Sequence, residues 1–313
     1  MVVITQPFAL TASVQANNFS VRNGQIISPS NAVYKARGIN VYEEDQSTVI
    51  ASSNGFPLLQ KFPRLNFVRL VCRSNYYPAT YYQQAINWLT AMSIVVELEH
   101  HVGAGGGVAP LSGSDLTAEN NWFGAMASAF KSNPYVWFGT LNEPSGPGAT
   151  LTAEQVSNYN TIRNAGNNSP VLFQVLGDYP TGTYQIGAGH GLTTASYSTM
   201  TNVMWDVHYY NYLSGYSTDQ QTNTNLVANY VSQAQTITSR DGVMPVIIGE
   251  YGISTNDSTL DAGGTQACIA AQSNPSGSAA WNWRSGGSYD LLTDGSGNLT
   301  SYGQQVAGWI STA

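Results

Sequence analysis

Two stretches decide the fold of this chain: Val136–Pro144, which reads VWFGTLNEP, and Pro245–Gly252, which reads PVIIGEYG. Each is an apolar, strand-like run that leads into a glutamate, Glu143 in the first and Glu250 in the second. Apolar runs of this kind are typical of parallel strands that are buried on both faces. Because α/β barrels carry their chemistry at the C-terminal ends of their strands, the two glutamates are candidates for a catalytic pair.

Similar β-branched runs recur at a regular distance, and their spacing matches the length of a strand–loop–helix–loop unit. We expect strands near residues 34–41, 66–72, 93–99, 135–141, 171–176, 203–209, 245–250 and 279–283. Eight such units predict an α/β fold of the (β/α)8 TIM-barrel type, for which roughly 250 residues are typical. A doubly wound open sheet is the alternative, but it would favour a glycine-rich phosphate turn after the first strand, and none is present.

Helical patterns lie between several of these runs. We expect helices over Tyr81–Met92, Leu116–Lys131, Ala153–Ala165 and Asn225–Thr238, and Thr117 and Thr152 resemble capping residues at helix starts. Residues 7–33 alternate weakly and contain Asn23-Gly24, a hairpin turn signal, so we expect a short N-terminal β-hairpin that closes the barrel floor. No linker is visible, and residues 1–313 are predicted to form one catalytic domain.

The composition excludes several classes of partner. Only 9% of the 313 residues are charged, the formal net charge is −7, and Lys35, Lys61 and Lys131 are the only lysines. Such a chain has no basic stripe for phosphates, so we expect no nucleic-acid partner. No apolar run of about 18 residues is present, so we expect no membrane span. A surface rich in Ser, Thr, Asn and Tyr suits a neutral polymer, and we expect a monomer.

The composition resembles that of extracellular proteins. Met1–Ile4 is too short for a signal sequence and lacks basic residues, so we expect a secreted protein whose signal peptide is absent from this sequence. Cys72 and Cys268 make no disulfide framework. One bridge between them is an open alternative, but we favour two free, buried thiols.

Polar and aromatic residues follow the predicted strands one after another. They are Asn40 in Gly38-Ile39-Asn40, Arg69, His101, Asn142 with Glu143, His208 with Tyr210, Glu250 and Trp283. This set closely resembles glycoside hydrolase family 5 over about residues 20–310, and Asn142-Glu143-Pro144 and Gly249-Glu250-Tyr251-Gly252 are its most specific parts. The resemblance implies a (β/α)8 barrel that cleaves β-linked polysaccharides with retention of configuration.

The resemblance also implies roles for these residues. Glu143 would be the acid/base and Glu250 the nucleophile, with Arg69 and Tyr210 holding Glu250 ionised and oriented. Asn142 would bind the 2-hydroxyl of the reacting sugar. Three further substrate-binding roles fall to His101, to His208, which would lie near Glu143, and to Trp283, which would stack on a sugar face. We expect no metal and no organic cofactor.

Two of these choices leave alternatives. The third strand ends in Glu99-His100-His101, and we choose His101 over His100 as the site residue, while Glu97 and Glu99 are candidate ion-pair partners of Arg37, Arg69 or Arg73. A zinc site from Glu99, His100 and His101 fits no usual ligand spacing. Trp283 is preferred to Trp281 for sugar stacking. The loop residues Tyr76, Tyr77, Tyr179 and Tyr212 are candidate walls of the cleft, and Trp122 is expected in the core.

The sequence predicts the substrate less directly than the reaction. The segment Phe130–Pro134, which leads into the strand that ends at Glu143, resembles cellulase branches of the family more than mannanase branches. We therefore expect an endo-β-1,4-glycanase acting on cellulose or another β-1,4-glucan, with endo-β-1,4-mannanase as the alternative. A noncatalytic carbohydrate-binding barrel is a remote alternative, because such a protein usually lacks one carboxylate and this chain has both.

Overall fold

The computed structural model describes residues 18–50, 57–73, 75–102, 107–178, 183–185, 192–210, 217–253, 261–292 and 297–312. Within these residues, eight parallel strands close a barrel in the order β10-β13-β14-β3-β4-β5-β6-β7. Their bounds are β3 Ala36–Tyr42, β4 Phe67–Arg73, β5 Val95–His101, β6 Val136–Gly139, β7 Val171–Gln174, β10 Val203–Tyr210, β13 Val246–Gly252 and β14 Gly277–Ala280. The predicted TIM barrel is confirmed, with its strands close to the expected positions.

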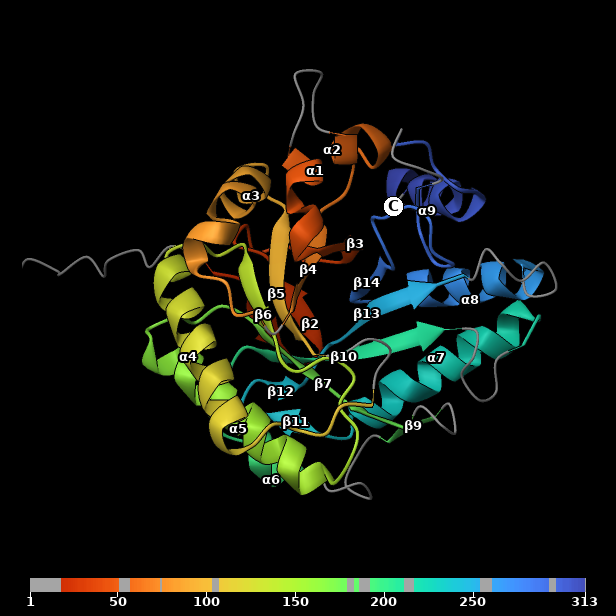
Figure 1. The fold of residues 1–313 in the computed structure, drawn as a ribbon. Coiled ribbons are helices and arrows are strands. Elements are labelled where there is room, and N and C mark those ends of the chain that lie inside the picture. The colour runs from red at the N-terminus through yellow and green to blue at the C-terminus, as the bar shows by residue number, and fades with distance from the viewer. Residues whose placement is uncertain are drawn as a thin grey trace, which may run out of the picture.

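Helices form an outer layer around the strands (Figure 1). They are η1 Glu43–Asp45, α1 Gln46–Ile50, α2 Pro57–Lys61, α3 Ala79–Ala91, α4 Gly113–Phe130, α5 Gly148–Asn164, α6 Thr194–Tyr197, α7 Gln220–Ala234, α8 Asp261–Ser273 and α9 Ser301–Thr312. In the part of the chain that the structure describes, three two-stranded sheets accompany the barrel: β1 Ser20–Arg22 with β2 Gln25–Ile27, β8 Leu176–Asp178 with β9 Thr183–Gln185, and β11 Thr238–Ser239 with β12 Gly242–Val243.

The predicted helices are present, but two predicted helix starts are wrong. Helix α4 begins at Gly113 after Ser112, and α5 begins at Gly148 after Pro147, so Thr117 and Thr152 lie inside the helices. The hydroxyl of Thr117 donates to the carbonyl oxygen of Gly113, one turn earlier, at 2.9 Å. Serine, threonine and aspartate patterns inside a helix can therefore imitate a cap when the helix starts earlier.

The N-terminal hairpin closes the barrel floor as expected. The β1–β2 hairpin places Phe19, Val21 and Ile26 against inward-facing side chains from the N-terminal halves of the strands. The shared cluster also contains Ala36, Phe67, Val95, Trp137, Leu172, Met204, Ile247 and Ala279. We call this set the floor layer. Burial of its apolar surface stabilises the barrel from one end and leaves the opposite end for chemistry.

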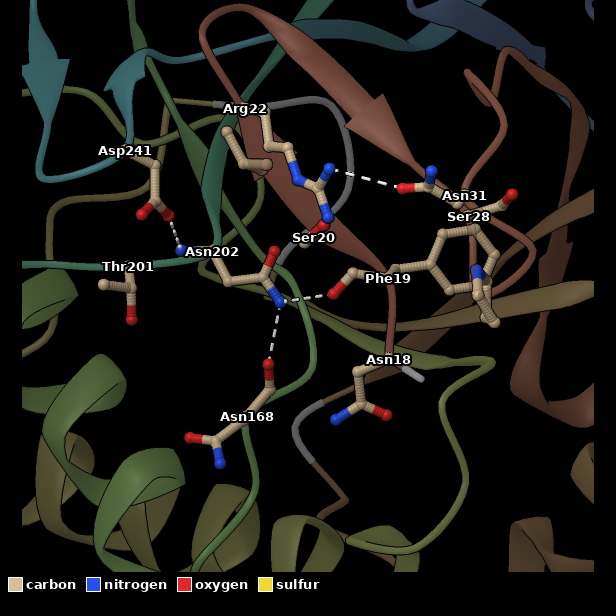
Figure 2. A pocket seen from close by; sticks show the side chains of 12 residues that line it. Asn18, Phe19, Ser20, Arg22, Ser28, Asn31, Asn168, Thr201, Asn202 and Asp241 are labelled. Carbon is tan, nitrogen blue, oxygen red and sulfur yellow. Dashed lines mark hydrogen bonds between the residues drawn. The ribbon is translucent and has the colours of Figure 1, made fainter. Parts of the chain in front are cut away.

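A pocket of about 640 Å³ lies at this floor, between the hairpin and neighbouring loops (Figure 2). The side chain of Asn202 crosses it and donates to the carbonyl oxygens of Phe19 and Asn168 at 2.9 and 2.7 Å. The backbone N–H of Asn202 donates to Asp241 at 2.6 Å. These bonds tie the hairpin to the barrel loops, and the pocket is lined by none of the predicted site residues.

Cys72 and Cys268 are free and buried, which confirms the favoured alternative. Burial raises the pKa of both thiols well above the usual value, so both are held as neutral, apolar groups. Among the described helices, none is long and apolar enough to cross a membrane.

Candidate active site

The strands bring the predicted carboxylates to one end of the barrel. Glu250 lies on β13 opposite His208 on β10, at a point where the register between the two strands shifts by one residue. Glu143 follows β6 in a left-handed backbone conformation, with φ +44°. A carboxylate oxygen of Glu143, one of Glu250 and a ring nitrogen of His208 all lie within 4.8 Å of one another. The two predicted catalytic glutamates therefore share one cleft.

Glu250 is held at both oxygens. Arg69 Nη1 donates to Oε1 at 2.6 Å, and the hydroxyl of Tyr210 donates to Oε2 at 2.8 Å. Burial raises the pKa of Glu250, and the positive charges of His208 and Arg69 oppose this rise. The two donors fix the direction of the carboxylate, as an attacking group requires, because a nucleophile must be aligned with its target atom.

His208 connects the two glutamates. Its Nδ1 lies 2.7 Å from Glu143 Oε1 and 3.4 Å from Glu250 Oε2, and its Nε2 lies 3.6 Å from Asp206 Oδ2. Burial opposes a charge on the ring, but Glu250 and Asp206 outweigh it, and the pKa of His208 rises to about 10. The ring therefore carries two protons near neutral pH, and Nδ1 donates its hydrogen bond to Glu143.

An ionic layer lies directly below the carboxylates, inside the barrel. Arg69 is fully buried, and its guanidinium lies 3.9 Å from Glu97, 3.3 Å from Glu99 and 3.4 Å from Asp206. Burial disfavours its charge, but the surrounding carboxylates outweigh this effect and raise the pKa of Arg69 well above its usual value. Burial raises the pKa of Glu97 well above the usual range, with Arg69 opposing. Glu97 is thus favoured in its protonated form.

Two glycines make room for this layer. A Cβ atom at Gly139 would collide with the Glu97 side chain, and one at Gly249 would collide with the Asp206 carboxylate. The backbone N–H of Gly249 instead donates to Asp206 Oδ1 at 2.8 Å. Asp206 therefore holds the residue next to Glu250 in the chain, and this contact lies at the register shift that sets Glu250 opposite His208.

The two histidines at the end of β5 face opposite sides of the strand. His101 lies in the cleft, with Nδ1 3.3 Å from Glu99 and Nε2 3.5 Å from the amide nitrogen of Asn142. Asn142 Oδ1 also accepts a hydrogen bond from Arg69 Nη2 at 2.8 Å. His100 points out of the barrel, where its Nδ1 lies 2.6 Å from Glu119. The geometry agrees with the choice of His101.

Trp283 is not brought to the cleft, and this choice needs correction. Its indole is only 3% exposed, packs near Phe62 at 6.1 Å between ring centroids, and donates to Thr48 at 3.0 Å. Trp281 lies at the cleft instead, stacked on His101 with ring centroids 5.8 Å apart. The predicted strand extends to residue 283, but β14 ends at Ala280, so strand alternation does not extend to Trp283.

The tyrosines expected as cleft walls are placed only in part. Tyr76 packs against His100 and Trp122 on the helix side of β5, and Tyr77 stacks on Tyr81 at 4.1 Å. Trp122 is buried in the core as expected. Tyr179 and Tyr212 lie outside the described residues.

Two side chains of the cleft were not predicted. Tyr42 ends β3 and lies 5.3 Å from the Trp281 ring, edge to face, and Asp206 supports His208 from below. Strand alternation could have found both. Tyr42 is two residues beyond Asn40, and Asp206 is two residues before His208, so each faces the same side of its strand as the predicted site residue.

Glu143, His208 and Glu250 are also the group that comes nearest to a metal-binding set among the described residues. A histidine must be neutral to bind a metal, whereas His208 here is favoured in its protonated form. Arg69 lies 2.6 Å from Glu250 and adds a second positive charge. The electrostatics of the site therefore favour proton transfer and sugar binding over a cation.

The family model for cellulase, glycosyl hydrolase family 5, matches residues 60–287. The chain belongs to glycosyl hydrolase family 5. This match spans most of the barrel, from α2 to the cleft residues after β14. The family-5 assignment makes the protein a glycoside hydrolase, in agreement with the paired glutamates at the strand ends.

Solved structures of family-5 enzymes share the fold. The catalytic domain of Thermobifida fusca endoglucanase Cel5A is 17% identical, with a TM-score of 0.70 and coverage of 95% of this chain and 98% of that one. The catalytic domain of a mannanase from Streptomyces sp. SirexAA-E is 16% identical, with a TM-score of 0.66 and coverage of 97% and 93%. A β-mannanase from Streptomyces thermolilacinus is 15% identical, with a TM-score of 0.67 and coverage of 95% and 96%. No curated protein sequence matches the chain.

Proposed function

We propose that this family-5 protein is a retaining endo-β-1,4-glycanase in which Glu250 is the nucleophile and Glu143 the acid/base. The observation that carries the proposal is the short approach of the two carboxylates, whose oxygens lie within 4.8 Å. Retaining glycosidases hold their carboxyl groups about 5–5.5 Å apart, whereas inverting enzymes need about 6.5–9.5 Å for an attacking water. The separation in this cleft supports direct attack by a carboxylate.

In the first step, Glu250 attacks the anomeric carbon while Glu143 gives its proton to the oxygen of the departing sugar. The glycosidic C–O bond breaks, and an ester forms between Glu250 and the sugar. Arg69 and Tyr210 orient the attacking carboxylate. Asn142, which is fixed by Arg69, is positioned to bind the 2-hydroxyl of the same sugar.

In the second step, the Glu143 carboxylate takes a proton from water, and the resulting hydroxide attacks the anomeric carbon. The ester bond breaks, Glu250 leaves as a carboxylate, and Glu143 is protonated for the next cycle. The pKa of His208 changes during this cycle, because the charge of Glu250 is the largest of the effects that raise it. Esterification of Glu250 removes that charge and weakens the hold of His208 on its second proton.

Aromatic side chains beside Glu250 supply the sugar-binding surface. Tyr42 and Trp281 line a hollow of about 410 Å³ together with Asn282, Arg284, Ser285, Gly287, Ser288, Tyr289 and Asp290. An indole face suits the apolar C–H surface of a sugar ring, and the polar residues around it suit the hydroxyls. This lining supports Trp281, rather than Trp283, as the residue that stacks on a sugar face.

Cellulose or a soluble β-1,4-glucan is the first candidate substrate, and β-1,4-mannan is the second. The second is favoured by one specific observation: two of the similar structures are those of mannanases. The polar, weakly charged composition supports a secreted monomer that binds no nucleic acid. The proposed two-carboxylate mechanism itself needs no metal or organic cofactor.

A panel of β-glycans followed by proton NMR tests the proposal. We expect chain shortening of β-1,4-glucan or β-1,4-mannan, with the β-anomer of the new reducing end appearing before mutarotation. The α-anomer appearing first would refute double displacement, and hydrolysis of neither polymer would refute the substrate class. Comparison of initial rates on the two polymers decides between glucan and mannan.

A further inference from the structure

A second group of buried titratable side chains lies outside the barrel, where helices α4 and α5 meet strand β5. His100 on β5, Glu119 on α4 and Glu154 on α5 are all buried. Glu119 Oε1 lies 2.6 Å from His100 Nδ1. Tyr76 lies beside this group: burial, followed by the charges of Glu119, Asp115 and Glu154, raises the pKa of its hydroxyl to about 12.

The carboxyl groups of Glu119 and Glu154 need a proton between them. Glu119 Oε2 and Glu154 Oε1 are both buried, and neither receives a donor from the described residues. A proton held between the two side chains would satisfy both oxygens, and burial together with the charge of Glu119 raises the pKa of Glu154 to about 9. One proton shared by two carboxyl groups is the expected state near neutral pH, because two adjacent buried carboxylates repel each other.

The pair anchors a chain segment that runs beside the proposed acid/base. Glu154 Oε2 accepts a hydrogen bond from the backbone N–H of Leu111 at 2.7 Å. Residues 107–111 lie between β5 and α4 in the sequence, and the N–H of Gly107 donates to the carbonyl oxygen of Glu143 at 3.0 Å. Val108 forms a parallel bridge with Pro144 and accepts a hydrogen bond from the N–H of Ser145 at 2.8 Å.

Glu143 depends on such support, because a left-handed backbone conformation is unfavourable for a residue with a Cβ atom. On its other side, the N–H of Asn142 donates to the carbonyl oxygen of His100 at 2.8 Å. Both supports lead to the same acids: the His100 side chain reaches Glu119, and residues 107–111 reach Glu154.

We propose that Glu119 and Glu154 form a proton-sharing pair that positions Glu143 for proton transfer, through His100 on one side and residues 107–111 on the other. This inference rests on the proposed role of Glu143 as the acid/base. Glu154 is then a positioning residue: it touches neither the substrate nor Glu143 itself. Its removal releases the Leu111 N–H and loosens the segment that holds the Glu143 carbonyl.

Misplacement of an acid has a specific kinetic signature. Cleavage of a polysaccharide needs a proton on the departing sugar, whereas a 2,4-dinitrophenyl glycoside has a leaving group that needs little acid assistance. A displacement of about 1 Å can cost roughly 100-fold in rate. Loss of stability alone lowers the amount of active enzyme and therefore affects both substrates equally.

The test compares three variants. Glu154→Met keeps the volume of the side chain but removes its acceptor, whereas Glu154→Gln keeps the acceptor for Leu111 and gives Glu119 a donor. Asn158→Ala, one turn further along α5, is the control. We expect Glu154→Met to lower kcat/KM on β-1,4-glucan or mannan by about 10- to 100-fold. On the dinitrophenyl cellobioside or mannobioside it should change kcat/KM less than about threefold. Glu154→Gln and Asn158→Ala should retain the wild-type ratio between the two substrates.

The outcomes separate the two proposals. Equal losses on both substrates, or no loss on either, would overturn the positioning role while wild-type glycanase activity still supports the proposed function. A wild-type enzyme that cleaves neither substrate would overturn the proposed function and the inference with it. Should Glu154→Met not fold, Glu154→Ala gives the same comparison of substrates, with the dinitrophenyl glycoside reporting the fraction of active enzyme.

Discussion

The floor layer and the ionic layer of the barrel come from the same strands, two residues apart, yet their chemistry is opposite. On β4, β5 and β10 the successive inward-facing residues are Phe67 and Arg69, Val95 and Glu97, and Met204 and Asp206. The floor excludes water with apolar side chains, as the layers of a TIM barrel usually do. The layer above it holds buried charges that contact one another and the cleft.

The floor layer serves stability and the ionic layer serves function, and the two follow each other along the barrel axis. Apolar burial in the floor layer favours folding without any specific partner. A buried ion pair contributes little net stability, because desolvation offsets the attraction between the charges. The ionic layer orients groups instead: Arg69 reaches Glu250, and Asp206 reaches both His208 and the N–H of Gly249. Mutations in the two layers should therefore have different signatures.

The largest effect is expected at the top of the ionic layer. Glu250→Gln removes the proposed nucleophile but keeps the shape of the side chain, so activity should fall below about one thousandth of wild type. Thermal unfolding should change little, and the variant should still bind oligosaccharide by calorimetry. Glu97→Gln is the matched control, because it makes the same substitution lower in the same network. Retention of more than a few per cent of activity would remove Glu250 from its role.

A smaller effect, confined to stability, is expected in the floor layer. Trp137 is fully buried and packs edge to face against Phe19 and Tyr34, with ring centroids 5.0 and 5.6 Å away. Trp137→Ala should lower the free energy of unfolding by about 3–5 kcal/mol, with kcat/KM of the folded enzyme nearly unchanged. Denaturant titration and kinetics at low temperature measure the two quantities. A large fall in kcat/KM of the folded protein would show that the layers are not independent.

The contrast also explains what could be predicted from the sequence. Runs of β-branched residues predict the strands, and strand alternation then places Arg69, His208 and Glu250 on the inner face. The same alternation would have found Asp206. It failed for Trp283, because the chain leaves the strand after Ala280 and the rule of alternation ends there.

The acids outside the barrel could not be predicted in this way. His100, Glu119 and Glu154 come from one strand and two helices, and their contact depends on how α4 and α5 pack on β5. Helical periodicity indicates which face of each helix is buried, but not which buried side chain meets which across the interface. The pairing of Glu119 with Glu154 is therefore a result of tertiary packing alone.

The smallest expected effect is the change in stability per pH unit, and it distinguishes the layers most sharply. Burial raises the pKa of Glu97 well above its usual value, so the folded protein keeps a proton that the unfolded chain loses above about pH 4.5. Stability falls with pH wherever the folded state binds more protons, by at most about 1.4 kcal/mol per pH unit for one group. Glu97 thus contributes a decline in stability that starts near pH 4.5 and continues as the pH rises towards its folded pKa.

Glu97→Gln should remove this contribution, because an amide resembles the protonated acid and does not titrate. Melting temperatures measured from pH 5 to 8 should therefore fall less steeply for Glu97→Gln than for the wild type, with the two curves closest at low pH. Trp137→Ala should lower the melting temperature by a similar amount at every pH, since no floor residue titrates in this range. Parallel curves for Glu97→Gln and the wild type would mean that Glu97 is ionised in the folded barrel, and the ionic layer would then carry one more negative charge than its geometry indicates.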